Sequence, residues 1–232
     1  MITTPNHDNF AVLVVAKAPV PGLAKTRLAA DVGDRAAAEI AAAALLDTLR
    51  VVAAVPARNR IVAITGDLAD AVRGDDVRDA LKDFIVIEQR GHDLGHRLAH
   101  AHSDTAAIVS GPIVQIGMDT PQLTPQLLLH AGRTLQCSSP TAVLGMAEDG
   151  GWWVLGVQNA VVAAAIATVP TSRPDTGERT RAALRDIGVR VLPVATLRDV
   201  DYLADLRAVA ARCSPTSQFR RAVHSLNHGS SA

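Results

Sequence analysis

Short apolar runs alternate with longer segments of helical periodicity along this chain of 232 residues. The runs are rich in Val, Ile and Ala and end at turn residues, which is typical of buried strands in a parallel sheet. We expect strands near residues 11–16, 60–65, 84–87, 112–117, 141–146, 152–157 and 189–194.

The segments between these runs have helical character. We expect helices within residues 34–55, 68–82, 94–102, 160–167, 176–187 and 202–211, and a further helix that begins at Pro125 after an N-cap at Thr124. Alternation of strand and helix predicts an α/β fold with a mostly parallel sheet between two helical layers, a three-layer α/β/α domain. We expect one domain over residues 10–212, with flexible tails at 1–9 and 213–232.

Composition narrows the class of protein. Apolar residues make up 48% of the chain and aromatic residues only 3%, so Ala, Val, Leu and Ile must build the core. The formal net charge is zero, and no basic stripe with aromatic residues points to nucleic acid. Cys137 and Cys213 lie too far apart for a metal motif and indicate a reducing compartment. With neither a transmembrane run nor a signal-peptide pattern, we expect a cytoplasmic protein.

The loop after the first strand is the most informative segment. It contains Pro19, Pro21 and Gly22 and then places Lys25, Thr26 and Arg27 side by side. Ligands bind at the carboxyl ends of strands in open α/β sheets, and two cations with a hydroxyl suit a phosphate group. The spacing of Gly and Lys excludes both a Walker P-loop and a Gly-x-Gly-x-x-Gly dinucleotide motif.

A carboxylate follows the fourth strand in the segment Gly117-Met-Asp-Thr-Pro121. Pro121 holds the preceding residue in an extended conformation. Asp119 is therefore placed either to cap the next turn or to bind a divalent cation such as Mg²⁺ or Mn²⁺, which prefers oxygen ligands and bridges to phosphates.

Two further acidic segments are candidates. Asp149 lies in Glu-Asp-Gly-Gly-Trp-Trp, which is either a hairpin turn or a tight turn open to a ligand, with Trp152 or Trp153 free to stack on a base or sugar. Asp201 follows the last strand and either caps the final helix or adds a second carboxylate to a metal.

Three histidines at helical spacing, His92, His96 and His100, have no neighbouring Glu or Cys of a zinc motif. A solvated helix face is the interpretation we favour over a zinc site. The chain also lacks the Gly-x-Ser-x-Gly pattern of serine hydrolases.

Four motifs in order resemble a known family. They are Lys-Ala-Pro-Val-Pro-Gly-x-x-Lys-Thr-Arg-Leu from Lys17, Gly-Met-Asp-Thr-Pro from Gly117, Glu-Asp-Gly-Gly-Trp-Trp-x-Leu-Gly from Glu148, and Asp-Val-Asp-x-x-x-Asp-Leu from Asp199. Together they resemble the bacterial glycosyltransferase-like family called domain of unknown function 2064, over about residues 11–207. This family is similar to phospholactate and molybdenum cofactor guanylyltransferases. The resemblance implies the single-domain nucleotide-diphosphosugar transferase fold, GT-A.

The resemblance also implies roles for individual residues. Lys25 and Arg27 would act on the donor phosphates, Asp67 would meet the ribose or base, and Asp149 would be the general base on an acceptor hydroxyl. The metal, Mg²⁺ or Mn²⁺, would be held by Asp119 and Asp201. The nucleotide-binding residues would be Ala16, Lys17, Ala18, Pro19, Gly22, Lys25, Arg27, Asp67 and Asp93, the last from the motif Asp-Leu-Gly-x-Arg-Leu.

Three functions fit this pattern. The leading hypothesis is metal-dependent glycosyl transfer from a nucleotide sugar to a small acceptor. The second is nucleotidyl transfer with release of pyrophosphate, because Pro121 replaces the second acid of the Asp-x-Asp motif that glycosyltransferases of this fold carry. The third is a nucleotide-binding module without turnover. We expect no nucleic-acid partner and no membrane span, and the sequence does not indicate an oligomeric state.

Overall fold

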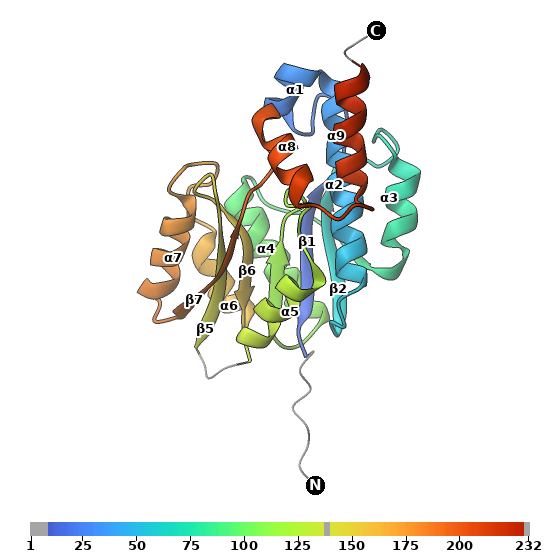
Figure 1. Ribbon diagram of the computed structural model, residues 1–232. Coiled ribbons are helices and arrows are strands. Elements are labelled where there is room, and N and C mark those ends of the chain that lie inside the picture. Colours follow the sequence, from blue (N-terminus) through green and yellow to red (C-terminus); the bar gives the residue numbers. More distant parts are fainter. Residues whose placement is uncertain (1–8, 137–139, 230–232) are drawn as a thin grey trace.

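The computed structural model describes residues 9–136 and 140–229, which contain one seven-stranded sheet in the order β3-β2-β1-β4-β6-β5-β7 (Figure 1). The strands are β1 Ala11–Lys17, β2 Asn59–Thr65, β3 Ile85–Glu88, β4 Ile113–Ile116, β5 Thr141–Ala147, β6 Trp152–Val157 and β7 Arg190–Leu197. Strands β3, β2, β1 and β4 are parallel, and β5 is parallel to β7. Only β6 runs against both of its neighbours. The expectation of a mostly parallel sheet is confirmed.

Helices cover both faces of the sheet, so the three-layer prediction is also confirmed (Figure 1). On one face lie α2 and α5, and on the other lie α4, α6 and α7. The helices are α1 Thr26–Val32, α2 Asp34–Ala53, α3 Gly74–Ala80, η1 Leu81–Asp83, α4 Leu94–Ile108, α5 Pro125–Thr134, α6 Ala160–Ala163, η2 Ala164–Ile166, α7 Thr176–Asp186, α8 Leu203–Arg212 and α9 Gln218–Gly229. In the described residues no helix is both long enough and apolar enough to cross a membrane.

Helix α2 is rich in alanine because it is enclosed on three sides. Leu45 and Leu49 face the sheet, Ile40 packs toward α8 and α9, and Ala38 and Ala42 contact Val72 of the loop before α3. A helix that is apolar around most of its circumference belongs in the interior. Small side chains let the neighbouring elements approach it closely.

The prediction of a flexible segment from residue 213 onward is wrong for residues 218–229, which form α9. Phe219 and Val223 are buried against α2 and α8, with Leu226 half-buried beside them. These three apolar positions, spaced four and three residues apart, lie in an otherwise polar segment. The polar composition concealed a narrow apolar stripe that is sufficient to dock a helix. Residues 1–8 and 230–232 lie outside the described residues.

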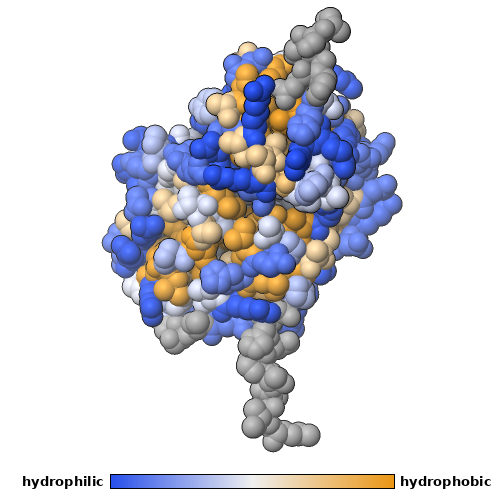
Figure 2. Space-filling view, viewed as in Figure 1, coloured by the Kyte–Doolittle hydropathy of each residue, from blue (hydrophilic) through white to orange (hydrophobic). Residues whose placement is uncertain are grey.

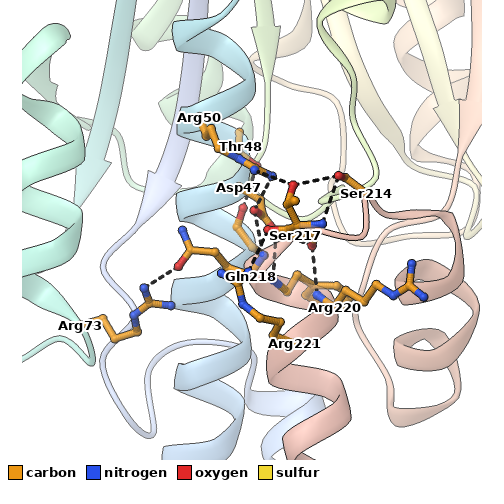
Figure 3. Close-up of polar contacts among 12 residues, drawn as sticks. Asp47, Thr48, Arg50, Arg73, Ser214, Ser217, Gln218, Arg220 and Arg221 are labelled. Carbon is orange, nitrogen blue, oxygen red and sulfur yellow. Dashed lines mark hydrogen bonds and ion pairs between the residues drawn. The ribbon is translucent and has the colours of Figure 1, made fainter.

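A buried carboxylate fastens the start of α9 to α2 (Figure 3). Asp47 on α2 is only 1% exposed. The Ser217 hydroxyl donates to its Oδ2 over 2.6 Å, and the backbone N–H groups of Gln218 and Phe219 donate over 3.0 and 2.9 Å. Arg50 pairs with its Oδ1 at 3.0 Å. The carboxylate therefore caps a helix that lies far away in sequence.

The sheet topology decides where loops meet. Because β6 is antiparallel to β4, β6 begins at the edge where β4 ends, and the turn from β5 into β6 lies at that same edge. The carboxyl ends of β1, β4 and β7 lie there too. On the face shown in Figure 2, apolar groups gather beside α5, whereas polar and apolar groups are mixed over the helices α1, α8 and α9 above that edge.

Candidate functional site

Two adjoining hollows of about 300 and 270 Å³ lie at this edge of the sheet. They share Arg27, Asp119, Ser172 and Asp201, so together they form one cleft with two lobes. The first lobe is also lined by Lys17, Lys25 and Met118, and the second by Asp149, Trp152, Arg173 and Asp199 among others. Cations thus gather in the first lobe, which we call the cationic lobe, and carboxylates in the second, which we call the acidic lobe.

The loop after β1 forms one wall of the cationic lobe. Its path is fixed at Ala18, whose N–H donates to the Thr65 carbonyl at 2.8 Å, and at Gly22, which has a φ of 76°. Lys17 is exposed and lines this lobe. Ala16, Ala18 and Pro19 are buried, and neither they nor Gly22 line either lobe. Lys25 then adopts a left-handed conformation, with a φ of 50°, at the residue before α1. Non-glycine residues with positive φ are uncommon and cluster at functional sites.

The Lys25 side chain turns inward and is only 8% exposed. Its Nζ lies 2.6 Å from Asp119 Oδ1 and 3.1 Å from Asp201 Oδ1, and it also donates to the Val200 carbonyl. Burial lowers the pKa of Lys25, but the charges and hydrogen bonds of the two aspartates outweigh it, so the pKa is raised above its ordinary value. The ammonium therefore stays charged.

Arg27, in the first turn of α1, is an accessible cation of this lobe. Its side chain is 48% exposed, and its Nη1 lies 2.9 Å from Asp201 Oδ2. The guanidinium also lies over the Tyr202 ring, 5.8 Å from the ring centre. An arginine held on one side and open on the other can make bidentate contacts with a phosphate.

Three carboxylates converge in the acidic lobe. Oxygens of Asp149, Asp199 and Asp201 lie within 4.8 Å of one another. The pKa of Asp199 is raised to about 6, mainly by burial and then by repulsion from Asp149 and Asp201. Carboxylates crowded in this way favour a cation among them.

The Asp149 turn is both a hairpin turn and a wall of the cleft. The Asp149 carboxylate accepts from the Gly151 N–H at 2.7 Å, and the Gly150 carbonyl accepts from the Gly177 N–H of α7 at 2.8 Å. Trp152 lines the acidic lobe, whereas Trp153 is 3% exposed and donates from Nε1 to the Ala195 carbonyl. One tryptophan thus belongs to the cleft and the other to the core.

Asp67 and Asp93 do not line either lobe. Asp67 accepts from the Ala69 N–H at 2.7 Å in a local turn. Asp93 caps α4 by accepting from the His96 N–H at 2.9 Å, and it also pairs with the His92 and His96 rings. Both carboxylates have local structural partners.

Several cleft residues were assigned no role from the sequence, among them Asp199 and Ser172. Asp199 carries a detectable signal, because it stands two residues before Asp201 after the last strand, and alternate residues of an extended chain face the same side. Ser172 carries no such signal. Its φ of 58° and its position between the lobes emerge only from the folded loop before α7.

The oxygen groups of the cleft fit a divalent cation. The Lys25 ammonium already stands among three oxygens, from Asp119, Asp201 and Val200. Oxygen ligands of this kind are the ones that Mg²⁺ and Mn²⁺ prefer. Asp119 and Asp201 therefore lie close enough for a single cation to bind both.

Comparison with protein families gives one match. The sequence profile of a family described as "Uncharacterized protein conserved in bacteria (DUF2064)" matches residues 48–173. Comparison with curated proteins finds no match.

Solved structures share the whole architecture. A protein from Desulfovibrio desulfuricans G20, provisionally described as a nucleotide-diphospho-sugar transferase, is 25% identical with a TM-score of 0.79 over 95% of this chain and 97% of its own. A nucleotidyl transferase from Methanothermobacter thermautotroptrophicus is 18% identical, with a TM-score of 0.56 over 88% and 98% of the two chains. A cytidylyltransferase from Leptospira borgpetersenii is 12% identical, with a TM-score of 0.57 over 96% and 95%. The last two similarities show the fold alone, which is the expected fold of nucleotide-diphosphosugar transferases.

Proposed function

Because the chain belongs to the bacterial family DUF2064 and has the fold of nucleotide-diphosphosugar transferases, we propose that it is a metal-dependent transferase that uses a nucleotide-activated donor. We propose further that it moves a glycosyl group from a nucleotide sugar to a hydroxyl group of a small acceptor. The observation that carries this proposal is the separation of charge within one cleft. Cations suited to a diphosphate lie in one lobe and carboxylates suited to an acceptor hydroxyl lie in the other.

The donor would bind with its diphosphate toward the cationic lobe. Arg27 is open to solvent on one side and can contact phosphate oxygens there. The backbone of residues 16–22 would approach the nucleoside, since Gly22 has no side chain to obstruct it. A divalent cation bound by Asp119 and Asp201 would neutralise charge on the departing diphosphate.

The acceptor would bind in the acidic lobe against Trp152. Asp149 is exposed there and would take the proton of the acceptor hydroxyl. The hydroxyl oxygen would form a bond to the anomeric carbon, the bond from that carbon to the phosphate oxygen would break, and the nucleoside diphosphate would leave. Arg27 would stabilise the negative charge that grows on the leaving group.

Nucleotidyl transfer is the second candidate. It is favoured by Pro121, which leaves a single Asp at the end of β4, and by two cations in one loop that can neutralise a triphosphate. In that reaction the acceptor would attack the α-phosphorus, and pyrophosphate would leave.

The reaction products distinguish these functions. The purified protein would be incubated with each common nucleoside triphosphate and nucleotide sugar, with Mg²⁺ or Mn²⁺, and a mixture of small hydroxyl acceptors. Release of a nucleoside diphosphate supports glycosyl transfer, and release of pyrophosphate supports nucleotidyl transfer. Nucleotide binding without either product would support a binding module. The Asp149→Asn variant should bind the donor but lose turnover.

A further inference from the structure

The Lys25 ammonium has all of its hydrogen-bond donors occupied by other groups of the protein. An ammonium group has three hydrogens to donate. Asp119, Asp201 and the Val200 carbonyl provide three acceptors, and the side chain is almost fully buried. In this conformation no N–H of the ammonium is left for a phosphate. Arg27, half-exposed in the cationic lobe, differs in this respect.

The backbone supports this inward orientation. Lys25 has a φ of 50° and a ψ of 47°, a left-handed conformation that is unfavourable for residues other than glycine. The Val200 N–H donates to the Asp119 carbonyl at 3.0 Å, so the loops that carry the two aspartates are joined beside the ammonium. The lysine and both carboxylates thus form one connected unit.

We propose that the Lys25 ammonium occupies the position of the divalent cation in the resting protein. Lys25 acts as a positioning residue that holds Asp119 and Asp201 together until metal arrives with a phosphorylated ligand. The inference rests on the proposed function, because it takes these two aspartates as the metal ligands. It adds that Lys25 and the metal compete for the same oxygens.

The competition explains why phosphate should promote metal binding. Metal arriving alone must displace a buried ammonium from its three acceptors. A bound diphosphate supplies such acceptors beside Arg27, so the displaced ammonium gains a new charged partner. Metal alone should therefore bind weakly, and metal with a nucleoside diphosphate should bind tightly.

Manganese binding tests this directly. Free Mn²⁺ would be measured by electron paramagnetic resonance during titration of the wild type and of Lys25→Met, first without nucleotide and then with GDP, UDP, CDP or ADP. We expect Lys25→Met to bind Mn²⁺ alone at least about tenfold more tightly than the wild type, which corresponds to about 1.4 kcal/mol. This advantage should shrink when a nucleoside diphosphate is bound.

Lys17→Met is the matched control, because it removes the same charge from the same lobe without touching the carboxylates. It should tighten Mn²⁺ binding by less than about threefold, since only long-range charge changes. Lys25→Gln serves if the methionine variant does not fold, because its amide still donates to the oxygens but carries no charge. It too should bind Mn²⁺ more tightly than the wild type.

Equal Mn²⁺ affinity in the wild type and the Lys25 variants would overturn the proposal. If Mn²⁺-dependent nucleotide binding persists in that case, the proposed function stands without it. Loss of Mn²⁺ binding in every protein, with and without nucleotide, would overturn both the competition and the metal site on which it rests.

Discussion

The carbonyl oxygen of Pro174 occupies the space that a β-carbon on Gly150 would need. Gly150 also has a φ of 90°, so two independent constraints exclude a larger residue there. The contact joins the Asp149 turn to the loop before α7. It therefore fixes the turn that carries the proposed general base against the loop before α7.

Gly150→Ala should damage both stability and turnover. Gly188→Ala is the matched control, because Gly188 has a φ of 79° but no neighbouring atom in the way of a β-carbon. The control should cost about 1–2 kcal/mol through its backbone conformation alone. Gly150→Ala should cost about 1–3 kcal/mol more through overpacking. Urea unfolding of both variants measures the difference, and equal losses would show that the Pro174 contact is unimportant.

Asp119→Asn should abolish metal-dependent nucleotide binding. A carboxylate at a strand end ordinarily contributes little to folding. The ion pair with buried Lys25 changes it, and because Asp119 is 45% exposed we expect a moderate loss of about 1–2 kcal/mol. Calorimetric titration with Mn²⁺ and nucleotide, together with urea unfolding, measures both effects. Asp70→Asn, at an exposed loop residue, should change neither.

Arg27→Ala should weaken binding of nucleoside diphosphates about 10- to 150-fold, because a charged hydrogen bond to phosphate contributes about 1.5–3 kcal/mol. The loss should be similar for different bases and much smaller for nucleosides without phosphate. Binding isotherms for a nucleoside and its diphosphate measure it. Arg35→Ala, on the exposed start of α2, should leave both affinities unchanged. An equal loss for nucleoside and diphosphate would refute the phosphate assignment.

His102 should make the protein sensitive to acid. It is fully buried on α4, and burial lowers its pKa to about 3 from an ordinary value near 6.5, although the neighbouring Gln115 side chain opposes this. Between pH 6.5 and 3 the His102 imidazole is therefore protonated in the unfolded chain and neutral in the folded protein. The free energy of unfolding is therefore unaffected by His102 above pH 6.5. Below pH 6.5 it falls by about 1.4 kcal/mol per pH unit, because the unfolded chain takes up the proton.

Urea unfolding at pH 7, 6 and 5 measures this loss. His102→Leu should remove that part of the pH dependence, so the difference between wild type and variant changes by about 1.4 kcal/mol per unit below pH 6.5. His130→Leu, at an exposed site on α5, should keep the wild-type slope. Identical slopes in all three proteins would mean that folding does not change the proton affinity of His102.

Asp47→Ala should detach α9. The substitution leaves the Ser217 hydroxyl and two backbone N–H groups without their acceptor, which should cost about 2–4 kcal/mol in total. Asp34→Ala, at the exposed start of the same helix, should cost less than about 1 kcal/mol. Limited proteolysis should cleave the Asp47 variant near residue 216 before any other site. Resistance equal to wild type would mean that apolar packing alone holds α9.

The strands were predictable because each is a continuous apolar run that ends at a turn residue. All seven expected strands are present, within two or three residues at their ends. The order of the strands was not predictable, since nothing in the run at 152–157 indicates that it inserts antiparallel between β4 and β5. Helix α9 was missed because its burial depends on Asp47 and α2, which are remote in sequence.

The candidate site was partly predictable for a related reason. Residues directly after strands, such as Asp119 and Asp201, could be assigned to one edge of the sheet from topology rules alone. The sequence could not indicate that Lys25 turns inward, because its orientation depends on a left-handed backbone and on two carboxylates from other loops. The roles of these residues in binding and turnover stay predictions.

The Asp47 cap also sets an order of events during synthesis. The ribosome makes Asp47 early, and Ser217 follows 170 residues later. Until then the outer side of α2 lacks the cover of α9, and a carboxylate destined for burial faces water. The sheet can form on the ribosome, but α2 acquires the cover of α9 only after residues 218–229 emerge. A chain that stops short of α9 therefore exposes an apolar helix face, which protein quality control recognises.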